Sequence, residues 1–99
     1  MAFELTGKQR AYLFGLSQTE NALFEIGKNG VTPEVVSSIR EALDKRELVK
    51  VNVLKNCPEE VKDVASTVSA RTRSSLVRVI GRRFVLYRRN GKEPVIKLP

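Results

Sequence analysis

Segments that favour helix and segments that favour strand alternate along this chain from Thr6 to Arg88, and this alternation limits the folds open to it. The predicted order is helix, strand, helix, strand, helix, strand, strand. Strands that alternate with helices pair in parallel through right-handed crossovers, whereas a final hairpin adds an antiparallel strand. We therefore expect the α/β class, as a two-layer α+β sandwich. A small four-stranded mixed sheet would pack against helices, with the first helix near an edge.

Three segments carry the signals of a helix start. Thr6 and Gln9 have the spacing of a capping box, and the helix they open runs to about residue 17. The second start is the clearest, because Thr32 is a typical N-cap residue and Pro33 suits the first helical position; this helix runs to about residue 45. Pro58, followed by two acids, opens the third. The predicted apolar stripe of the first helix consists of Ala11, Tyr12, Leu13 and Leu16.

The strand segments are rich in β-branched and aromatic residues and cover residues 23–26, 48–54, 75–80 and 83–88. In the second of these, Val49, Val51 and Val53 alternate and predict the core face. The last two segments flank Gly81-Arg82, a pattern typical of a hairpin with a type II′ turn. Residues 90–99 are interpreted as a tail, with a short extended segment near Val95 and Ile96.

The length and charge of the chain restrict the classes of function that it can have. The 99 residues suit a single domain, and 18 Lys+Arg against 11 Asp+Glu give a formal net charge of +7. Between Asp63 and Glu93 the chain carries eight cations and no acid, and seven of these cations are arginine. Arginine suits bidentate phosphate contacts, so this stretch favours a polyanionic partner over a merely solvated face. The eight cations are Arg71, Arg73, Arg78, Arg82, Arg83, Arg88, Arg89 and Lys92.

The segment Gly27-Lys28-Asn29-Gly30 lies between a predicted strand and the helix start at Thr32. Glycines at its ends permit positive φ and remove the Cβ atoms that would block a ligand. Backbone N–H groups, the helix dipole and the Lys28 charge would then converge on one phosphate. We interpret the segment as a backbone clamp for nucleic acid, with an ordinary strand-to-helix turn as the alternative. Of the acids, only Glu25 and Glu34 are expected near it.

Two further groups of cations are candidate contacts. Lys8 and Arg10 oppose the dipole of the first helix, which suggests an anion nearby. From the arginine-rich stretch we select Arg78, Arg82, Arg83 and Arg88 as phosphate contacts. Tyr87 is interpreted first as core packing and second as a base-stacking residue.

Several classes of function are disfavoured. The chain has no histidine and a single cysteine, Cys57, so we expect no metal site, no cofactor and no enzymatic activity. It has no apolar run long enough to span a membrane and no signal-peptide pattern, which predicts a cytoplasmic protein. We expect a monomer without a small-molecule substrate.

Six blocks of the chain, in order, resemble the YhbY family of stand-alone bacterial CRM domains, named for chloroplast RNA splicing and ribosome maturation. The blocks are Leu5–Arg10, Ile26–Thr32, Glu41–Leu43, Glu47–Val51, Leu76–Gly81 and Val85–Arg88, and the closing Ile96–Pro99 is similar to the tail of some members. The resemblance implies a fold like the C-terminal domain of bacterial translation initiation factor three. It also implies RNA binding through the GXXG loop and association with precursors of the large ribosomal subunit.

The chain departs from the family pattern at two places. The link after the first helix, Ser17–Ala22, lacks the histidines and proline that the family often has there. The third loop residue is Asn29 where the family often has glycine, but both outer glycines remain.

Two other functions remain open at this point. One is a general binder of nucleic acid or anionic surfaces. The other is a metal-dependent nuclease, which without histidine would need clustered carboxylates.

Overall fold

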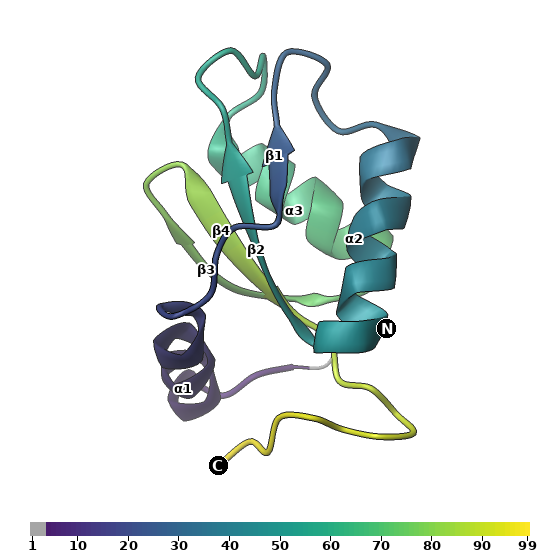
Figure 1. Ribbon diagram of the computed structural model, residues 1–99. Coiled ribbons are helices and arrows are strands. Elements are labelled where there is room, and N and C mark those ends of the chain that lie inside the picture. The colour runs from purple at the N-terminus through teal and green to yellow at the C-terminus, as the bar shows by residue number, and fades with distance from the viewer. Residues whose placement is uncertain (1–3) are drawn as a thin grey trace.

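The computed structural model describes residues 4–99, and Figure 1 shows three helices and four strands in the expected order. The predicted fold class is confirmed. The elements are α1 (Gly7–Ser17), β1 (Phe24–Ile26), α2 (Pro33–Arg46), β2 (Leu48–Val53), α3 (Val61–Thr72), β3 (Ser75–Ile80) and β4 (Arg83–Tyr87). Within these residues no helix is long and apolar enough to cross a membrane.

The strands form one mixed sheet in the order β1-β2-β4-β3. β1 pairs with β2 in parallel, whereas β4 is antiparallel to both β2 and β3. The register between β3 and β4 shifts between Leu76 and Arg78, as in a β-bulge. In the two-residue connection of this hairpin Gly81 has φ +58°, which a type II′ turn requires at its first central position.

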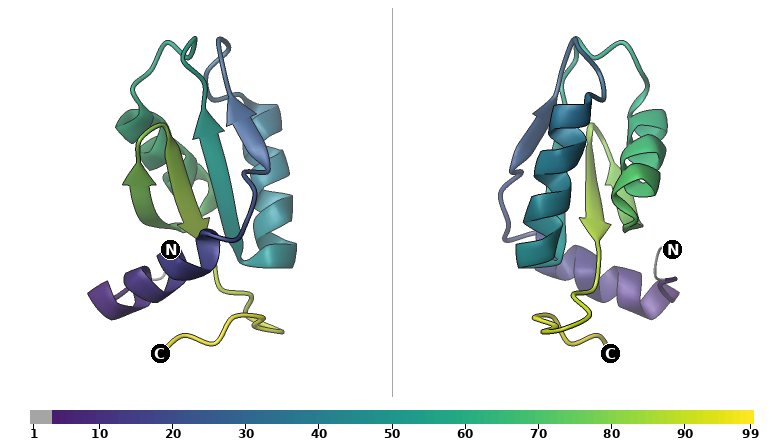
Figure 2. Two further views of the ribbon diagram at one scale, coloured as in Figure 1. Left: turned by 60° about the vertical axis from the view of Figure 1, so that its left-hand side comes forward. Right: turned by 90° about the vertical axis from the view of Figure 1, so that its right-hand side faces the viewer.

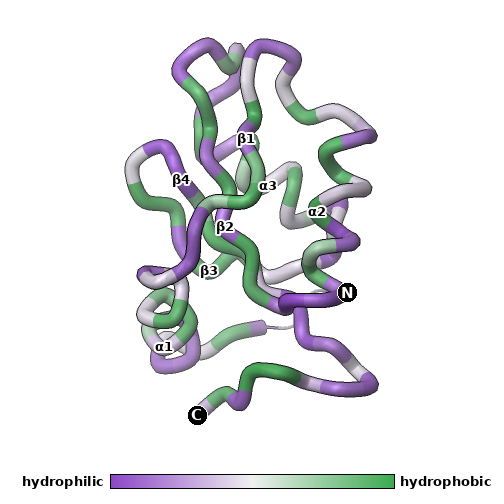
Figure 3. Tube along the Cα trace, in the orientation of Figure 1, coloured by the Kyte–Doolittle hydropathy of each residue, from purple (hydrophilic) through white to green (hydrophobic). Residues whose placement is uncertain are grey.

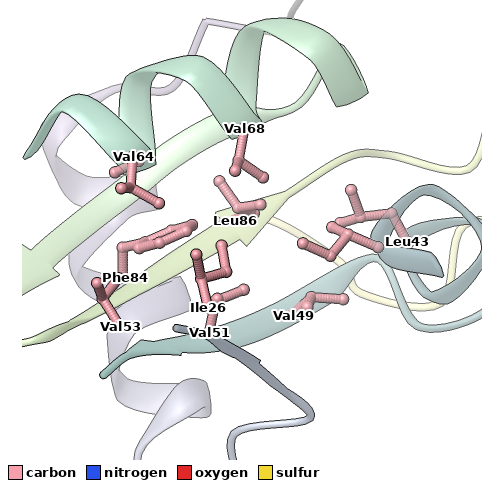
Figure 4. Packing of buried hydrophobic residues seen from close by; sticks show 11 residues of the cluster. Ile26, Leu43, Val49, Val51, Val53, Val64, Val68, Phe84 and Leu86 are labelled. Atoms are coloured by element: carbon pink, nitrogen blue, oxygen red, sulfur yellow. The ribbon is translucent and has the colours of Figure 1, made fainter. Parts of the chain in front are cut away.

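The main core lies between the sheet and the two helices α2 and α3, which cover the same face (Figure 2). Val49, Val51 and Val53 point into it, as the alternation in the sequence predicted. Figure 4 shows α3 directing Val64 and Val68 toward the side chains of β4. This face is therefore closed along the length of the sheet.

The opposite face is closed only at one end. There a second cluster joins Leu13 of α1 to Leu48, Val85 and Tyr87 of the central strands. The α1 stripe that we predicted is wrong in composition, because Tyr12 is 43% exposed while Leu13 and Ser17 are buried. Beyond α1 this face of the sheet is not covered by a helix (Figure 2).

Helix starts agree with the sequence at two of three places. Thr6 and Gln9 form the capping box, and the Thr32 hydroxyl accepts a hydrogen bond from the N–H of Val35 at 3.2 Å. The third helix begins at Val61, not at Pro58, and its N-cap residue makes no side-chain cap hydrogen bond. The two acids expected in its first turn therefore precede the helix.

The C-terminal segment, which we predicted as a tail with a short extended segment near Val95 and Ile96, contains no strand and lies against the second core. Its backbone is held by the buried carboxylate of Glu47, which accepts hydrogen bonds from the N–H groups of Asn90 at 2.6 Å and of Val95 and Ile96 at 2.7 Å each. Ile96 and Leu98 pack on the second core. The predicted tail is thus part of the folded domain.

Candidate nucleic-acid interface

The Gly27–Gly30 segment forms a tight turn at the end of β1. The N–H of Gly30 donates to the carbonyl of Gly27 at 2.9 Å, and Gly30 has φ +65°. Lys28 and Asn29 are the central residues of the turn and both are exposed. Within residues 4–99, no group accepts a hydrogen bond from their backbone N–H groups. The turn therefore offers two backbone donors and the Lys28 ammonium to the outside.

The positive φ predicted for the glycines is found at Gly30, but the missing side chains of both glycines face the protein instead of a ligand. A Cβ on Gly27 would lie 3.2 Å from Asn56 Oδ1 and 3.3 Å from Leu54 Cδ1, both in the β2–α3 connection. A Cβ on Gly30 would lie 3.0 Å from a carboxylate oxygen of Glu59. The glycines thus let the turn pack against the neighbouring loop and, at Gly30, adopt positive φ.

Glu59 corrects our expectation about acids near the loop. The sequence suggested Glu25 and Glu34, but the carboxylate of Glu59 is the acidic group that the geometry places against Gly30. Its negative charge opposes a phosphate on that side of the turn. An incoming anion is therefore favoured on the exposed Lys28–Asn29 side.

The first turn of α2 follows this segment directly. Thr32 caps the helix, and Pro33 occupies a position where a backbone N–H is not needed. The positive end of the helix dipole thus lies next to the turn, as predicted, although Glu34 in the first turn partly offsets it.

Arg82 and Arg83 belong to the same end of the sheet as this turn. The Arg82 guanidinium donates through Nε to the carbonyl of Val53 at 3.0 Å and through Nη2 to the carbonyl of Leu54 at 2.6 Å. The N–H of Leu54 donates in turn to the carbonyl of Ile26, beside the Gly27 turn. Arg83 is exposed. Figures 1 and 3 show the hydrophilic β1–α2 and β2–α3 loops side by side, with the β3–β4 turn nearby.

The structure does not bring the other predicted contacts to this end. Lys8 is exposed on α1, which lies at the far end of the molecule from the β1–α2 loop (Figure 1). Arg10 donates to the carbonyls of Leu76 and Val77, so it joins α1 to β3. Arg78 lies 4.3 Å above the ring of Phe14.

Among the arginines predicted to contact phosphate, Arg88 forms both an ion pair and hydrogen bonds within the protein. It pairs with Asp44 and donates to the carbonyls of Thr72 at 2.8 Å and Arg40 at 3.2 Å, thereby tying β4 to α2 and the end of α3. Its side chain is 22% exposed. These contacts give Arg88 a structural role.

Tyr87 is fully buried in the second core, so the core-packing interpretation holds. Burial raises the pKa of its phenol, and the Glu47 carboxylate raises that pKa further, while Arg89 acts in the opposite direction. Of the two aromatic side chains of α1, Tyr12 is exposed and Phe14 is half-buried.

Sequence reasoning missed three polar residues on the uncovered sheet face: Lys50, Asn52 and Lys55. Lys50 and Asn52 alternate with the buried valines of β2, and Lys55 follows that strand. The signal was available, because a strand with one apolar face presents its intervening residues on the other.

Comparison with known proteins gives consistent matches over nearly the whole chain. The model of the CRS1 / YhbY (CRM) domain matches residues 5–88. A Bacillus subtilis protein named "Probable RNA-binding protein YqeI" is 42% identical over 95 residues, which cover 96% of this chain and 99% of that protein. An "RNA-binding protein" of Haemophilus influenzae is 35% identical over 96% of this chain and 95% of its own length.

A solved structure shows the same fold. The solution structure of the hypothetical protein SAV1595 from Staphylococcus aureus superposes with a TM-score of 0.82 at 43% identity, covering 97% of this chain and all of that one.

Proposed function

The chain belongs to the CRS1/YhbY (CRM) domain family, and from that premise we propose that it is an RNA-binding protein that acts by binding and not by catalysis. The observation that carries the proposal is the exposed Lys28-Asn29 turn, whose two backbone N–H groups have no acceptor among residues 4–99, beside the N-terminus of α2. These groups suit a phosphate of an RNA backbone.

A second set of contacts comes from the β3–β4 turn and its surroundings. Arg83 and Lys55 are exposed, and Arg82 is fixed by two carbonyls that orient its charge without neutralising it. We assign the phosphate contacts to this end of the sheet. Lys8 and Arg78 are secondary candidates, whereas Arg10 and Arg88 hold the fold.

The RNA that we propose is ribosomal RNA in precursors of the large ribosomal subunit. The family resemblance supports this part of the proposal, since the geometry of a backbone clamp carries no sequence information. We expect a monomer that is found in the cytoplasm with ribosomal particles. Crosslinking in cells, followed by sequencing of the bound RNA, tests this: enrichment of messenger RNA over ribosomal RNA would argue against it.

The clamp is tested with the double variant Lys28→Ala/Asn29→Asp, in titrations of a structured ribosomal RNA fragment at several salt concentrations. We expect roughly tenfold weaker binding and a log–log salt slope that is less steep by about 0.7, because a phosphate contact is lost. The matched control is Lys45→Ala/Arg46→Gln, which also lowers the charge by two at exposed positions at the other end of α2.

Three outcomes would contradict the proposal. If the loop variant and the control bind equally well, the turn is not the clamp. Equal affinity of the protein for duplex DNA and for ribosomal RNA at physiological salt would favour a general anion binder. Turnover of RNA by the purified protein with Mg²⁺ would favour the nuclease.

A further inference from the structure

The uncovered half of the sheet forms a groove of about 560 Å³ beside α1. Its floor consists of Lys50, Asn52 and Val85 from the two central strands. Phe14 of α1 lines one side, and the β3–β4 turn with Leu54 and Lys55 lines the other. We call this the open-face groove; its volume lies within the range of about 300–1,000 Å³ typical of small-ligand sites.

The open-face groove is positively charged. Lys50 Nζ donates to the carbonyls of Ser17 at 3.2 Å and Glu20 at 3.3 Å, much as Arg82 donates to those of Val53 and Leu54. Carbonyl partners orient a cation but leave its charge in place. Among the described residues that line the groove none is acidic; Glu25, exposed on β1, pairs in register with Asn52.

Apolar surface is exposed in the same groove. Ile80 is 45% exposed and Leu54 is 37% exposed, although Ile80 pairs with Arg83 across the hairpin and Leu54 directly precedes Lys55. Phosphate contacts alone do not require such surface. An unpaired nucleobase does, because it has apolar faces that stack on side chains and a polar edge that forms hydrogen bonds.

Asn52 provides a group that could read such an edge. Its Oδ1 atom is covered and accepts no hydrogen bond from the described residues. A buried acceptor without a partner is unfavourable, and turning the amide about χ2 would break no hydrogen bond at this oxygen. An amide carries both donors and an acceptor and so can pair with a base edge.

The open-face groove adjoins the proposed clamp through Leu54. Leu54 lines the groove, and its Cδ1 atom also packs against Gly27, 3.3 Å from where a Cβ would be. An RNA strand held at Lys28 would therefore pass the mouth of the groove.

We propose that the open-face groove binds an unpaired nucleobase of single-stranded RNA, with Asn52 contacting the base edge and the surrounding cations contacting the flanking phosphates. This inference rests on the proposed function, since it assigns the part of the RNA adjacent to the clamp. It predicts a preference for RNA with unpaired nucleotides over fully paired RNA.

The test compares a hairpin RNA that has a single-stranded loop with a blunt duplex of the same stem. Asn52→Ala should weaken binding to the hairpin by roughly tenfold and leave duplex binding and the salt slope unchanged. Asn21→Ala, an exposed asparagine outside the groove, is the matched control and should bind both RNAs as wild type does.

This design distinguishes failure of the groove inference from failure of the proposed clamp. If Lys28→Ala/Asn29→Asp weakens binding but Asn52→Ala does not, the groove inference is overturned and the clamp stands. If neither variant weakens binding, both the groove inference and the proposed function are overturned.

A second measurement does not depend on the folding of a variant. The hairpin, with one photoreactive 4-thiouridine in its loop, is crosslinked to wild-type protein, and the modified peptide is identified by mass spectrometry. We expect the crosslink in the segments that line the groove, around Phe14, Asn52 or Ile80. A crosslink confined to α2 or to the C-terminal segment would overturn the inference.

Discussion

At the scale of single residues, arginine is where sequence and structure diverge most. Arg10 and Arg88 satisfy backbone carbonyls and one carboxylate within the fold, whereas Arg83 is exposed. A guanidinium suits a phosphate and a carbonyl equally well, so residue type alone could not separate these roles. The caps at Thr6 and Thr32 were predictable because their partners lie three residues away.

Tyr87 gives a prediction about pH. Its pKa is raised above the ordinary 10.0 by burial and by Glu47, so the folded protein keeps the phenol proton where the unfolded chain has released it. The stability from this group is complete below about pH 10 and is lost as the pH rises through the folded pKa.

We therefore expect the free energy of unfolding of the wild type to fall more steeply than that of Tyr87→Phe above about pH 10. Urea unfolding at increasing pH measures this difference. Tyr12→Phe, at the exposed tyrosine, is the control and should follow the wild type. Parallel curves for the wild type and Tyr87→Phe would show that the phenol does not contribute.

At the scale of elements, alternation and capping predicted the order of helices and strands, and the β2 valines predicted the main core face. The sequence could not show that residues 90–98 dock on the domain. Their anchor, Glu47, lies 43 to 49 residues from the N–H groups that it binds. It also has φ +64°, in a C-cap position where glycine is usual, so no local pattern marks it.

The Glu47 anchor predicts that Glu47→Gln destabilises the protein. A glutamine presents NH₂ where the carboxylate accepts, so at least one of the N–H groups loses its partner. We expect the free energy of unfolding to fall by about 2–3 kcal/mol, measured by urea unfolding near neutral pH.

Glu41→Gln, at an exposed position of α2, is the control and should change stability by less than about 0.5 kcal/mol. Amide hydrogen exchange should also accelerate at Val95 and Ile96 in Glu47→Gln. Unchanged protection of these two amides would contradict the anchoring role.

At the scale of the whole molecule, the chain carries a net charge of +7, and ion pairs within the fold hold little of its positive charge. Among residues 4–99 the ion pair recorded is that between Arg88 and Asp44. Mutual repulsion therefore opposes the compact state, and salt screens repulsion. The proposed RNA partner would relieve the same repulsion.

We expect the free energy of unfolding of the RNA-free protein to rise by about 1 kcal/mol between about 0.05 M and about 0.5 M sodium chloride. The double variant Lys55→Gln/Arg83→Gln lowers the formal charge from +7 to +5 and should show a smaller rise. A loss of stability with added salt would mean that attractive charge pairs dominate.

The contact of Arg10 with β3 has a consequence for self-association. β3 is an edge of the sheet, and an edge strand can template addition of a strand from another chain. Arg10 already occupies the carbonyls of Leu76 and Val77, and the bulge at Leu76–Arg78 disturbs the regular spacing that an added strand would need. The arginine that resembled a phosphate contact in the sequence thus makes the addition of a strand at β3 less favourable.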